Sequence, residues 1–217
     1  FLKAQVAGKL LRPSVDRLLR PVVGDWVKIR ALWQEKKAVI QEVLPRSSLL
    51  RRKAAGESEA VQPLAANVSL TLIVTTLNRE FNEKRLHRYL TAAEESGSRV
   101  AVLFTKSDLI PESFACAEEL SGKYRIPCLA LSAVNGEGME ALRELWGKGE
   151  TAVFVGSSGV GKSTLSNALL GREEQVTGRI RDEDDRGRHT TTYRRLLLLP
   201  NGAMVDRKST RLNSSHV

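Results

Sequence analysis

The sequence predicts an α/β domain with a mostly parallel sheet, preceded by a small all-β barrel. From residue 67 onward, short apolar stretches of strand length alternate with amphipathic stretches of helix length, a pattern typical of a parallel sheet covered on both faces. Before residue 46, the chain contains segments with β-strand propensity, separated by residues typical of turns. With 217 residues, of which 41% are hydrophobic and 27% charged, the chain can bury a core in each of two domains.

The barrel is expected over residues 1–45. Its stretches with β-strand propensity lie at residues 22–30 and 37–43, and Pro45 is expected to end the second strand. So few strands cannot close a barrel, and we therefore expect the start of this domain to be missing. The polar residues 46–66 that follow are interpreted as a linker or an exposed loop.

The parallel sheet and its helices are expected over residues 67–205. Strands are predicted at residues 70–75, 100–104, 127–131 and 152–155, and helices at residues 83–95, 112–124, 139–146 and 162–170. A polar, charge-dense loop then covers residues 172–192. Two further strand candidates, at residues 193–199 and 203–205, flank a turn at Pro200-Asn201-Gly202 and indicate a β-hairpin.

The composition argues against several classes of protein. No apolar run approaches the length of a membrane span and no signal peptide opens the chain, so we expect a cytoplasmic protein with no membrane partner. Cys116 and Cys128 form neither a CxxC pair nor a disulfide framework, and they are interpreted as reduced, partly buried thiols without chemistry. We expect a monomer.

The positive charge is concentrated at the start of the chain. Residues 1–53 contain 13 Lys and Arg against 4 Asp and Glu, whereas residues 54–217 contain 21 of each. The whole net charge of +9 therefore lies in the first quarter. This distribution is typical of a nucleic-acid-binding module attached to a neutral domain, although a solvated basic surface without special use would look the same.

A glycine-rich stretch after the strand predicted at residues 152–155 matches the pattern GxxxxGK[ST]. It comprises Gly156, Ser157, Ser158, Gly159, Val160, Gly161, Lys162 and Ser163, and Thr164 follows. In such a P-loop, backbone N–H groups wrap the phosphates and the N-terminus of the next helix adds partial positive charge. Lys162 would reach the outer phosphates, and the Ser163 hydroxyl would bind Mg²⁺. An ordinary glycine turn is disfavoured, because the stretch stands between a strand and a helix.

The segment Thr105-Lys106-Ser107-Asp108 is a candidate for recognition of the base of a bound nucleotide. The Asp108 carboxylate can accept hydrogen bonds from guanine N1–H and N2–H together, and adenine does not offer this pair of donors. A buried carboxylate left unpaired is costly, so such a site rejects adenine. Lys106 would lie along the plane of the base. Alone, this four-residue pattern is weak and is more often a chance loop.

A third motif supports the second. Ser132 and Ala133 follow the strand predicted at residues 127–131, and the Ala133 backbone N–H could reach the guanine O6. All three motifs therefore stand at strand ends, where α/β sheets bind ligands. Their order is unusual, because the base-reading motifs precede the P-loop, whereas the usual GTPase has the P-loop first. The same sheet can be built with its connections permuted.

With these motifs in this order, the sequence resembles the ribosome small-subunit-dependent GTPase A family, the RsgA (YjeQ, EngC) type of circularly permuted GTPase. The resemblance runs from the N-terminal region to about Val205. It is carried by Val23-Gly24-Asp25-Trp26-Val27, Pro45-Arg46, Ala66-Asn67-Val68, Thr105-Lys106-Ser107-Asp108-Leu109, residues 156–164, Gly187-Arg188-His189-Thr190-Thr191-Thr192 and Asn201-Gly202-Ala203.

The resemblance implies an oligonucleotide-binding (OB) barrel followed by a permuted GTPase domain. It also implies GTP hydrolysis to GDP, coupled to late maturation of the small (30S) ribosomal subunit. Arg51, Arg52 and Lys53 are then candidates for contact with the rRNA backbone. For Trp26 we expect a place in the core in preference to an RNA-stacking role, because aromatic residues near a turn are usually packed.

The resemblance further identifies residues 187–192 as the first switch region. Either Thr190 or Thr191 would close onto Mg²⁺ and the γ-phosphate. Enzymes of this type lack the usual water-positioning glutamine, so His189 could orient the attacking water. An exposed loop histidine without function is the alternative.

The chain departs from the family after residue 205. Asp206 would be the Mg²⁺-facing aspartate, but the family's Asp-Thr-Pro-Gly and its zinc-binding Cys and His do not follow. Residues 206–217 resemble vector read-through, so we expect a non-native tail on a fragment truncated at both ends, with no Zn²⁺ site. Such a fragment is expected to bind guanine nucleotide and to hydrolyse it slowly.

Two other functions are compatible with parts of the sequence. One is a non-catalytic chain that binds GTP and RNA, and the other is a P-loop ATPase or kinase. Asp108 disfavours the second, because its carboxylate favours guanine. GTP turnover that rises on addition of small subunits would exclude the first.

Overall fold

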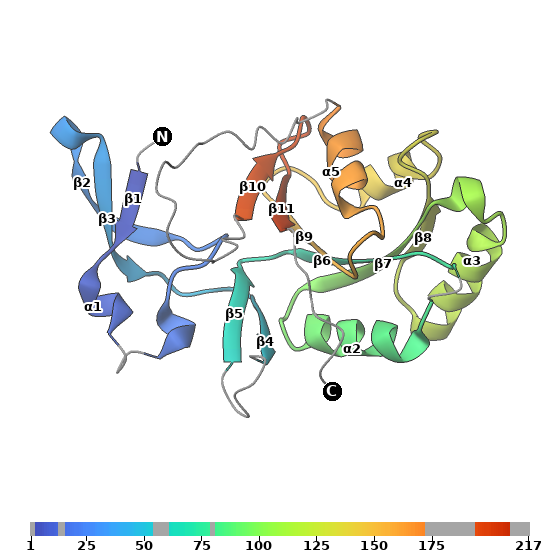
Figure 1. Ribbon diagram of the computed structural model, residues 1–217, viewed down its shortest axis with the longest axis horizontal. Helices are drawn as coiled ribbons and strands as arrows, with labels where there is room; N and C mark the ends of the chain where they lie inside the picture. Colours follow the sequence, from blue (N-terminus) through green and yellow to red (C-terminus); the bar gives the residue numbers. More distant parts are fainter. Residues whose placement is uncertain (1–2, 13–15, 54–60, 79–80, 172–193, 209–217) are drawn as a thin grey trace, which may run out of the picture.

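The computed structural model describes residues 3–12, 16–53, 61–78, 81–171 and 194–208. A six-stranded sheet with helices on both sides forms the larger part of the molecule (Figure 1). The N-terminal segments form smaller sheets beside it. None of the described helices combines the length and the apolar character needed to cross a membrane.

The larger sheet has the order β10-β11-β9-β6-β7-β8. Its strands are β6 (Leu70–Thr75), β7 (Arg99–Thr105), β8 (Cys128–Leu131), β9 (Thr151–Val155), β10 (Arg194–Leu198) and β11 (Met204–Lys208). All neighbours pair in parallel except β10 and β11, which form the expected antiparallel hairpin. The central strand β6 is buried on both faces, which explains its continuous apolar run. The predicted, mostly parallel α/β sheet is confirmed.

Four helices cover the two faces of this sheet. They are α2 (Glu83–Glu94), α3 (Ser113–Tyr124), α4 (Met139–Glu144) and α5 (Lys162–Leu170). One core packs α4 and α5 against the sheet, with Leu142 and Leu165 fully buried. A second core on the opposite face packs α2 and α3, through residues such as Leu86 and Leu120. The alternation of strands and helices in the sequence thus corresponds to the alternation of layers.

The N-terminal strands form an open three-stranded sheet of order β1-β3-β2. These strands are β1 (Lys3–Val6), β2 (Val27–Leu32) and β3 (Lys37–Val43), with a short helix α1 (Gly8–Leu11) after β1. β2 and β3 are antiparallel, while β1 runs parallel to β3. No closed barrel is formed by the residues described, so the all-β OB barrel stays a prediction. Trp26, expected in the core, is instead 69% exposed.

Residues 46–66, expected as a linker or loop, include two paired strands. β4 (Leu49–Lys53) and β5 (Val61–Ala66) form an antiparallel pair. Leu50, Leu64 and Ala65 are buried and pack with Val153 of β9. The few apolar residues of this polar segment gather on one face only after the strands pair, so no periodic signal in the sequence revealed them.

Strand β11 continues to Lys208, past the boundary expected at residue 205. Its last residues pair with the start of β10, Lys208 lying opposite Arg194. Because strand pairing uses backbone groups, it does not depend on the side chains that departed from the family pattern. Asp206 lies within this strand and is 1% exposed.

Candidate functional site

The three predicted nucleotide motifs lie at one edge of the larger sheet. Strands β7, β8 and β9 run in the same direction within the sheet and end at Thr105, Leu131 and Val155. Each end leads directly into one motif. The carboxyl edge of a parallel sheet is where α/β proteins bind ligands, so the topology brings together segments that are up to 55 residues apart in the chain.

The P-loop leaves β9 in close contact with β6. Gly156 has a φ of +149°, and a Cβ at this position would lie 2.1 Å from the carbonyl oxygen of Val74. No side chain can be accommodated there without moving the backbone of β6. The first glycine of the motif therefore has a packing reason that is separate from phosphate contact.

Lys162 folds back across its own loop. Its Nζ donates hydrogen bonds to the carbonyl oxygens of Gly156, at 2.8 Å, and of Ser157. Burial lowers the pKa of the Lys162 ammonium, because desolvation disfavours the charged form. Phosphate oxygens are better partners for this ammonium than neutral carbonyls, so an entering nucleotide can take their place.

The other P-loop residues surround the start of α5. Val160 is buried, and Ser157, Gly161 and Lys162 are partly buried. The exposed members are Ser158, Gly159, Ser163 and Thr164. Because the first turn of a helix leaves backbone N–H groups without helical partners, α5 presents both donors and a positive dipole end at this point. These features fit an anion.

Thr105 connects the segment predicted to recognise the base to the P-loop. Its hydroxyl is held inside the protein, with the residue 4% exposed, and lies 2.7 Å from the carbonyl oxygen of Val160 and 3.1 Å from that of Thr75. A single O–H group is shared between these two acceptors. Thr105 was predicted to bind nucleotide, and in the structure its side chain braces β6, β7 and the P-loop against one another.

Lys106 and Asp108 follow as exposed residues. Lys106 adopts a left-handed conformation with φ +64°, and Asp108 lies in the 3-10 turn η3 (Ser107–Leu109). Ser107 between them is 3% exposed, and its hydroxyl lies 3.5 Å from a carboxylate oxygen of Glu137. The buried serine anchors the turn while the carboxylate of Asp108 faces solvent, where a base could reach it.

Ser132 shapes the loop after β8. It is fully buried, and its Oγ accepts hydrogen bonds from the backbone N–H of Val134 (3.2 Å) and of Asn135 (3.4 Å). Its own N–H donates to the carbonyl of Glu137. The side chain of Ser132 is thus occupied within the loop, and Ala133, which is partly buried, is the member of the pair left for a ligand.

The candidate metal ligands are only partly described. Ser163 is exposed on the first turn of α5, and Asp206 lies opposite Val153 of β9, on the strand beside the one that leads into the P-loop. Their hydroxyl and carboxylate oxygens are the donor type that Mg²⁺ prefers. His189, Thr190 and Thr191 lie outside the described residues. Within the described part of the chain, no group of three or more His, Cys, Asp and Glu side chains could hold a metal.

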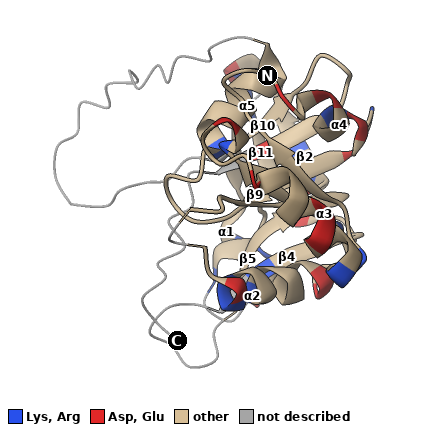
Figure 2. Cartoon of the chain, turned by 90° about the vertical axis from the view of Figure 1, so that its right-hand side faces the viewer, with Lys and Arg blue, Asp and Glu red and all other residues tan. Residues whose placement is uncertain are grey.

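The predicted RNA-contact cluster lies on a different sheet. Arg51, Arg52 and Lys53 belong to β4, and Arg51 is exposed. Helix α2 packs against β4 and carries the exposed Lys84 and Arg88. Figure 2 shows both blue (Lys, Arg) and red (Asp, Glu) positions on α2. No signal in the sequence indicated that α2 lies against β4, because β5 and β6 stand between them in the chain.

Glu137 is another residue that sequence analysis missed. Its side chain approaches Ser107 and its backbone carbonyl accepts from Ser132, so it links the two segments predicted to recognise the base. No signal in the sequence could have identified it, since it stands 30 residues from Ser107 in an exposed loop.

Comparison with known families agrees with this geometry. A family model described as RsgA GTPase matches residues 43–207. The chain is 42% identical over 214 residues to the small ribosomal subunit biogenesis GTPase RsgA of Opitutus terrae, covering 94% of this chain and 58% of that relative. It is 41% identical over 205 residues to the protein of the same name from Methanosarcina acetivorans, covering 94% of this chain and 54% of that one.

Solved structures give the same result. The chain is similar to the crystal structure of YjeQ from Thermotoga maritima, with a TM-score of 0.64 and 26% identity over 94% of this chain and 64% of that one. It also shares the fold of YloQ, described as a circularly permuted GTPase, with a TM-score of 0.58 at 19% identity, covering 94% and 61% of the two chains.

Proposed function

Because the chain belongs to the RsgA GTPase family, we propose that it binds GTP and hydrolyses it to GDP and phosphate during maturation of the small ribosomal subunit. The chain spans less than two thirds of the length of the relatives it matches, so this activity is proposed for the protein as a whole. The observation that carries the proposal is the hydrogen bond from Thr105 to Val160, which joins the base-reading segment to the P-loop.

In the proposed site, the P-loop binds the phosphates. Backbone N–H groups of residues 156–161 and the first turn of α5 surround the β- and γ-phosphates, and Lys162 exchanges its loop carbonyls for phosphate oxygens. Mg²⁺, when bound, neutralises charge that develops on the phosphates. Ser163, Asp206 and either Thr190 or Thr191 would hold it.

Guanine is selected at the other end of the site. The exposed carboxylate of Asp108 accepts from N1–H and N2–H, Lys106 lies along the ring, and the Ala133 N–H donates to O6. The anchors of Ser107 and Ser132 hold these groups before the ligand arrives, which reduces the ordering cost of binding. His189 is proposed to orient the attacking water.

RNA binding is proposed for the N-terminal part, with residues 1–45 as an OB-type domain, residues 46–66 connecting it and residues 67–205 as the GTPase domain. Supporting observations are the basic residues of β4 and the exposed Trp26 and Trp33, which flank β2. Exposed aromatic rings suit single-stranded RNA because bases stack on them, and basic groups suit its phosphates. The proposed setting is a cytoplasmic monomer bound to the small subunit.

Substitution of Asp108 tests the proposal. Asp108→Asn replaces the double acceptor with a group that can donate to a 2-oxo position, so preference should move from GTP towards xanthosine triphosphate. The measurement is the Kd of both nucleotides and of ATP for the two proteins, with turnover in the presence of small subunits. Equal binding of GTP and ATP by the unmodified protein contradicts guanine recognition, and binding without turnover contradicts the hydrolase.

A further inference from the structure

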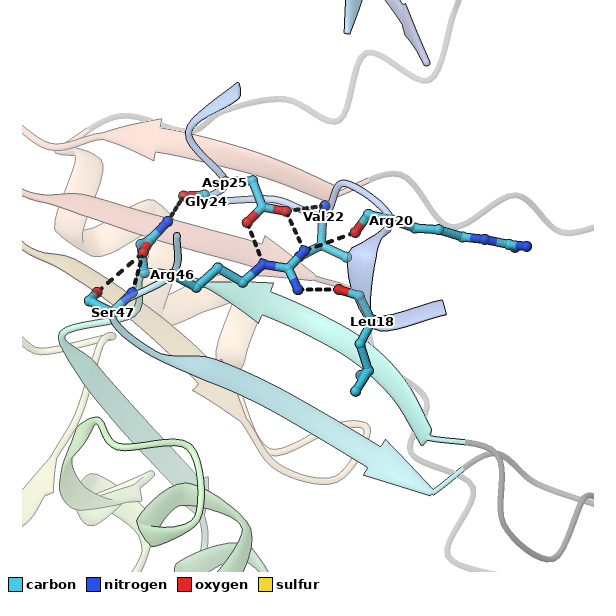
Figure 3. Close-up of polar contacts among 8 residues, drawn as sticks. Leu18, Arg20, Val22, Gly24, Asp25, Arg46 and Ser47 are labelled. Carbon is cyan, nitrogen blue, oxygen red and sulfur yellow. Dashed lines mark hydrogen bonds and ion pairs between the residues drawn. The ribbon is translucent and has the colours of Figure 1, made fainter. Parts of the chain in front are cut away.

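Three sequence motifs that the nucleotide site does not use meet at one place in the fold. Gly24-Asp25, Arg46 and Asn67 come from separate segments of the chain and are joined by hydrogen bonds. Figure 3 shows the contacts between Asp25 and Arg46. The network lies between the N-terminal sheet and β6, where the chain passes from one part of the molecule to the other.

Asp25 and Arg46 form a buried ion pair. The Arg46 Nε lies 2.7 Å from one carboxylate oxygen of Asp25, and an Nη lies 2.8 Å from the other. The guanidinium also donates to the backbone carbonyls of Leu18 and Arg20, and Asp25 accepts from the N–H of Val22. With 1% of the Asp25 side chain and 13% of the Arg46 side chain exposed, the pair is almost fully desolvated and well satisfied.

The ion pair closes the base of the β2–β3 pair. Asp25 stands two residues before β2 begins, and Arg46 stands three residues after β3 ends. Pairing of the two side chains therefore holds both ends of the hairpin together, in addition to the backbone bond from Leu44 to Trp26. The chain therefore enters β2 and leaves β3 at one place, and the two strands are held together there.

Asn67 attaches that unit to the next part of the chain. Its amide oxygen accepts from the Ser47 N–H (2.9 Å) and hydroxyl (3.2 Å), and its amide nitrogen donates to the Gly24 carbonyl (2.8 Å). The residue adopts a left-handed conformation with φ +53°. One side chain thereby contacts the segments on both sides of the ion pair.

The backbones at this point are in close contact. Ala66 donates to the Val23 carbonyl, and a Cβ on Gly24 (φ +91°) would lie 2.0 Å from the Ala66 oxygen. Asn67 stands three positions before Leu70, where β6 begins. At its other end, β6 presents Val74 to Gly156 of the P-loop and the Thr75 carbonyl to Thr105. The same strand thus contacts the network at its start and the nucleotide motifs at its end.

We propose that Asp25, Arg46 and Asn67 are positioning residues that hold the N-terminal sheet in a fixed orientation on the start of β6, so that RNA bound by that sheet is coupled to GTP turnover. The coupling rests on the proposed function, whereas the fixed orientation does not. A mere contribution to the stability of the N-terminal sheet is the competing explanation.

Asn67→Gly is the test variant, because glycine keeps the left-handed backbone and removes the three side-chain hydrogen bonds. Ser47→Ala removes only the weakest of them and should have a smaller effect. Asn201→Gly, in the β10–β11 turn, is the matched control for an Asn-to-Gly change elsewhere. The amide of Ser47 reports directly on its hydrogen bond to Asn67, because hydrogen exchange of this amide should accelerate in Asn67→Gly.

The first measurement is the distance distribution between spin labels on Arg30→Cys in β2 and Glu118→Cys in α3, both exposed positions, in a background lacking Cys116 and Cys128. We expect a narrow distribution that Asn67→Gly broadens and Asn201→Gly leaves unchanged. A broad distribution without Asn67→Gly, or a narrow one with it, overturns the fixed orientation whether or not the protein hydrolyses GTP.

The second measurement is GTP turnover with increasing amounts of small subunits. Asn67→Gly should keep its GTP and subunit affinities while stimulation by subunits falls at least about tenfold, as expected when a bound group is misplaced far from the chemistry. Unchanged stimulation alongside a broadened distribution overturns the coupling, and so does a parallel loss of GTP affinity. Absence of stimulation in the unmodified protein counts against the proposed function. The distance measurement by itself then tests the fixed orientation of the N-terminal sheet.

Discussion

At the scale of single residues, the brace formed by Thr105 can be tested with two conservative substitutions. Thr105→Val keeps the shape and removes the hydroxyl, leaving the buried carbonyls of Val160 and Thr75 without this donor. The free energy of unfolding should fall by about 1–3 kcal/mol, and GTP affinity should fall with it because the P-loop loses its support.

Thr105→Ser is the control, because it keeps the donor and loses only a methyl group. Its GTP affinity should stay close to that of the unmodified chain. Denaturant unfolding and nucleotide titration measure the two quantities. If the valine and serine variants bind GTP equally well, the hydroxyl does not brace the site.

The thiol of Cys128 gives a prediction on pH. Burial, and to a smaller extent the nearby Cys116, raises the pKa of Cys128 to about 11. The folded chain thus keeps a proton that the unfolded chain releases at about pH 8.5, so stability is lost as pH rises from there to about 11. The difference in unfolding free energy between the unmodified chain and Cys128→Ala should shrink over this window by up to about 3 kcal/mol. A constant difference would show that the thiol is freely ionisable.

At the scale of elements, helix α3 contains a residue that weakens it. Gly122 is exposed within the helix, and a Cβ there would meet no atom within 4 Å. Gly122→Ala should raise the free energy of unfolding by about 0.5–1 kcal/mol, because alanine loses less backbone entropy in a helix. Ala115→Gly, at another exposed position of α3, should lower it by a similar amount. Thermal unfolding of both variants checks the pair, and a decrease for Gly122→Ala would contradict the helix argument.

Strand β4 is the element whose assignment changed the most. The segment was expected as a linker because its residues are polar, yet Leu50 and Leu64 bury the pair of strands against β9. Arg51, Arg52 and Lys53 therefore belong to a paired strand and not to a loop. A paired strand spaces its residues regularly, which suits contact with the phosphates of RNA.

At the scale of the whole molecule, RNA affinity should depend steeply on salt. Reversal of Arg51, Arg52 and Lys53 to Glu removes three candidate phosphate contacts, so the slope of log K against log salt should fall by about 2–3. GTP affinity should stay unchanged, because β4 is outside the nucleotide edge. Reversal of Arg143 and Lys148, which are exposed near α4, is the control and should leave the slope nearly intact. RNA affinity insensitive to salt would contradict the electrostatic argument.

Much of the nucleotide domain could be predicted from the sequence. The apolar run of β6 and the helix after the P-loop were placed at the bounds that the structure has, Leu70–Thr75 and Lys162–Leu170. Both depend on local signals, namely burial on two faces of a strand and a glycine-rich turn before a helix. The order of the motifs, which indicates the permuted connections, is likewise a property of the sequence alone.

Only the tertiary structure decided which of these residues act on one another. Thr105 contacts a carbonyl 55 positions away, Asn67 one 43 positions away, and Arg46 a carboxylate 21 positions away. Hydrophobic periodicity and turn chemistry are set by neighbours in the chain, so they can be read from it. A hydrogen bond between distant side chains depends instead on how strands are ordered and packed. For that reason the sequence by itself determined the sheet and its motifs. The fold determined that Thr105 braces the P-loop and that Asp25, Arg46 and Asn67 meet at the start of β6.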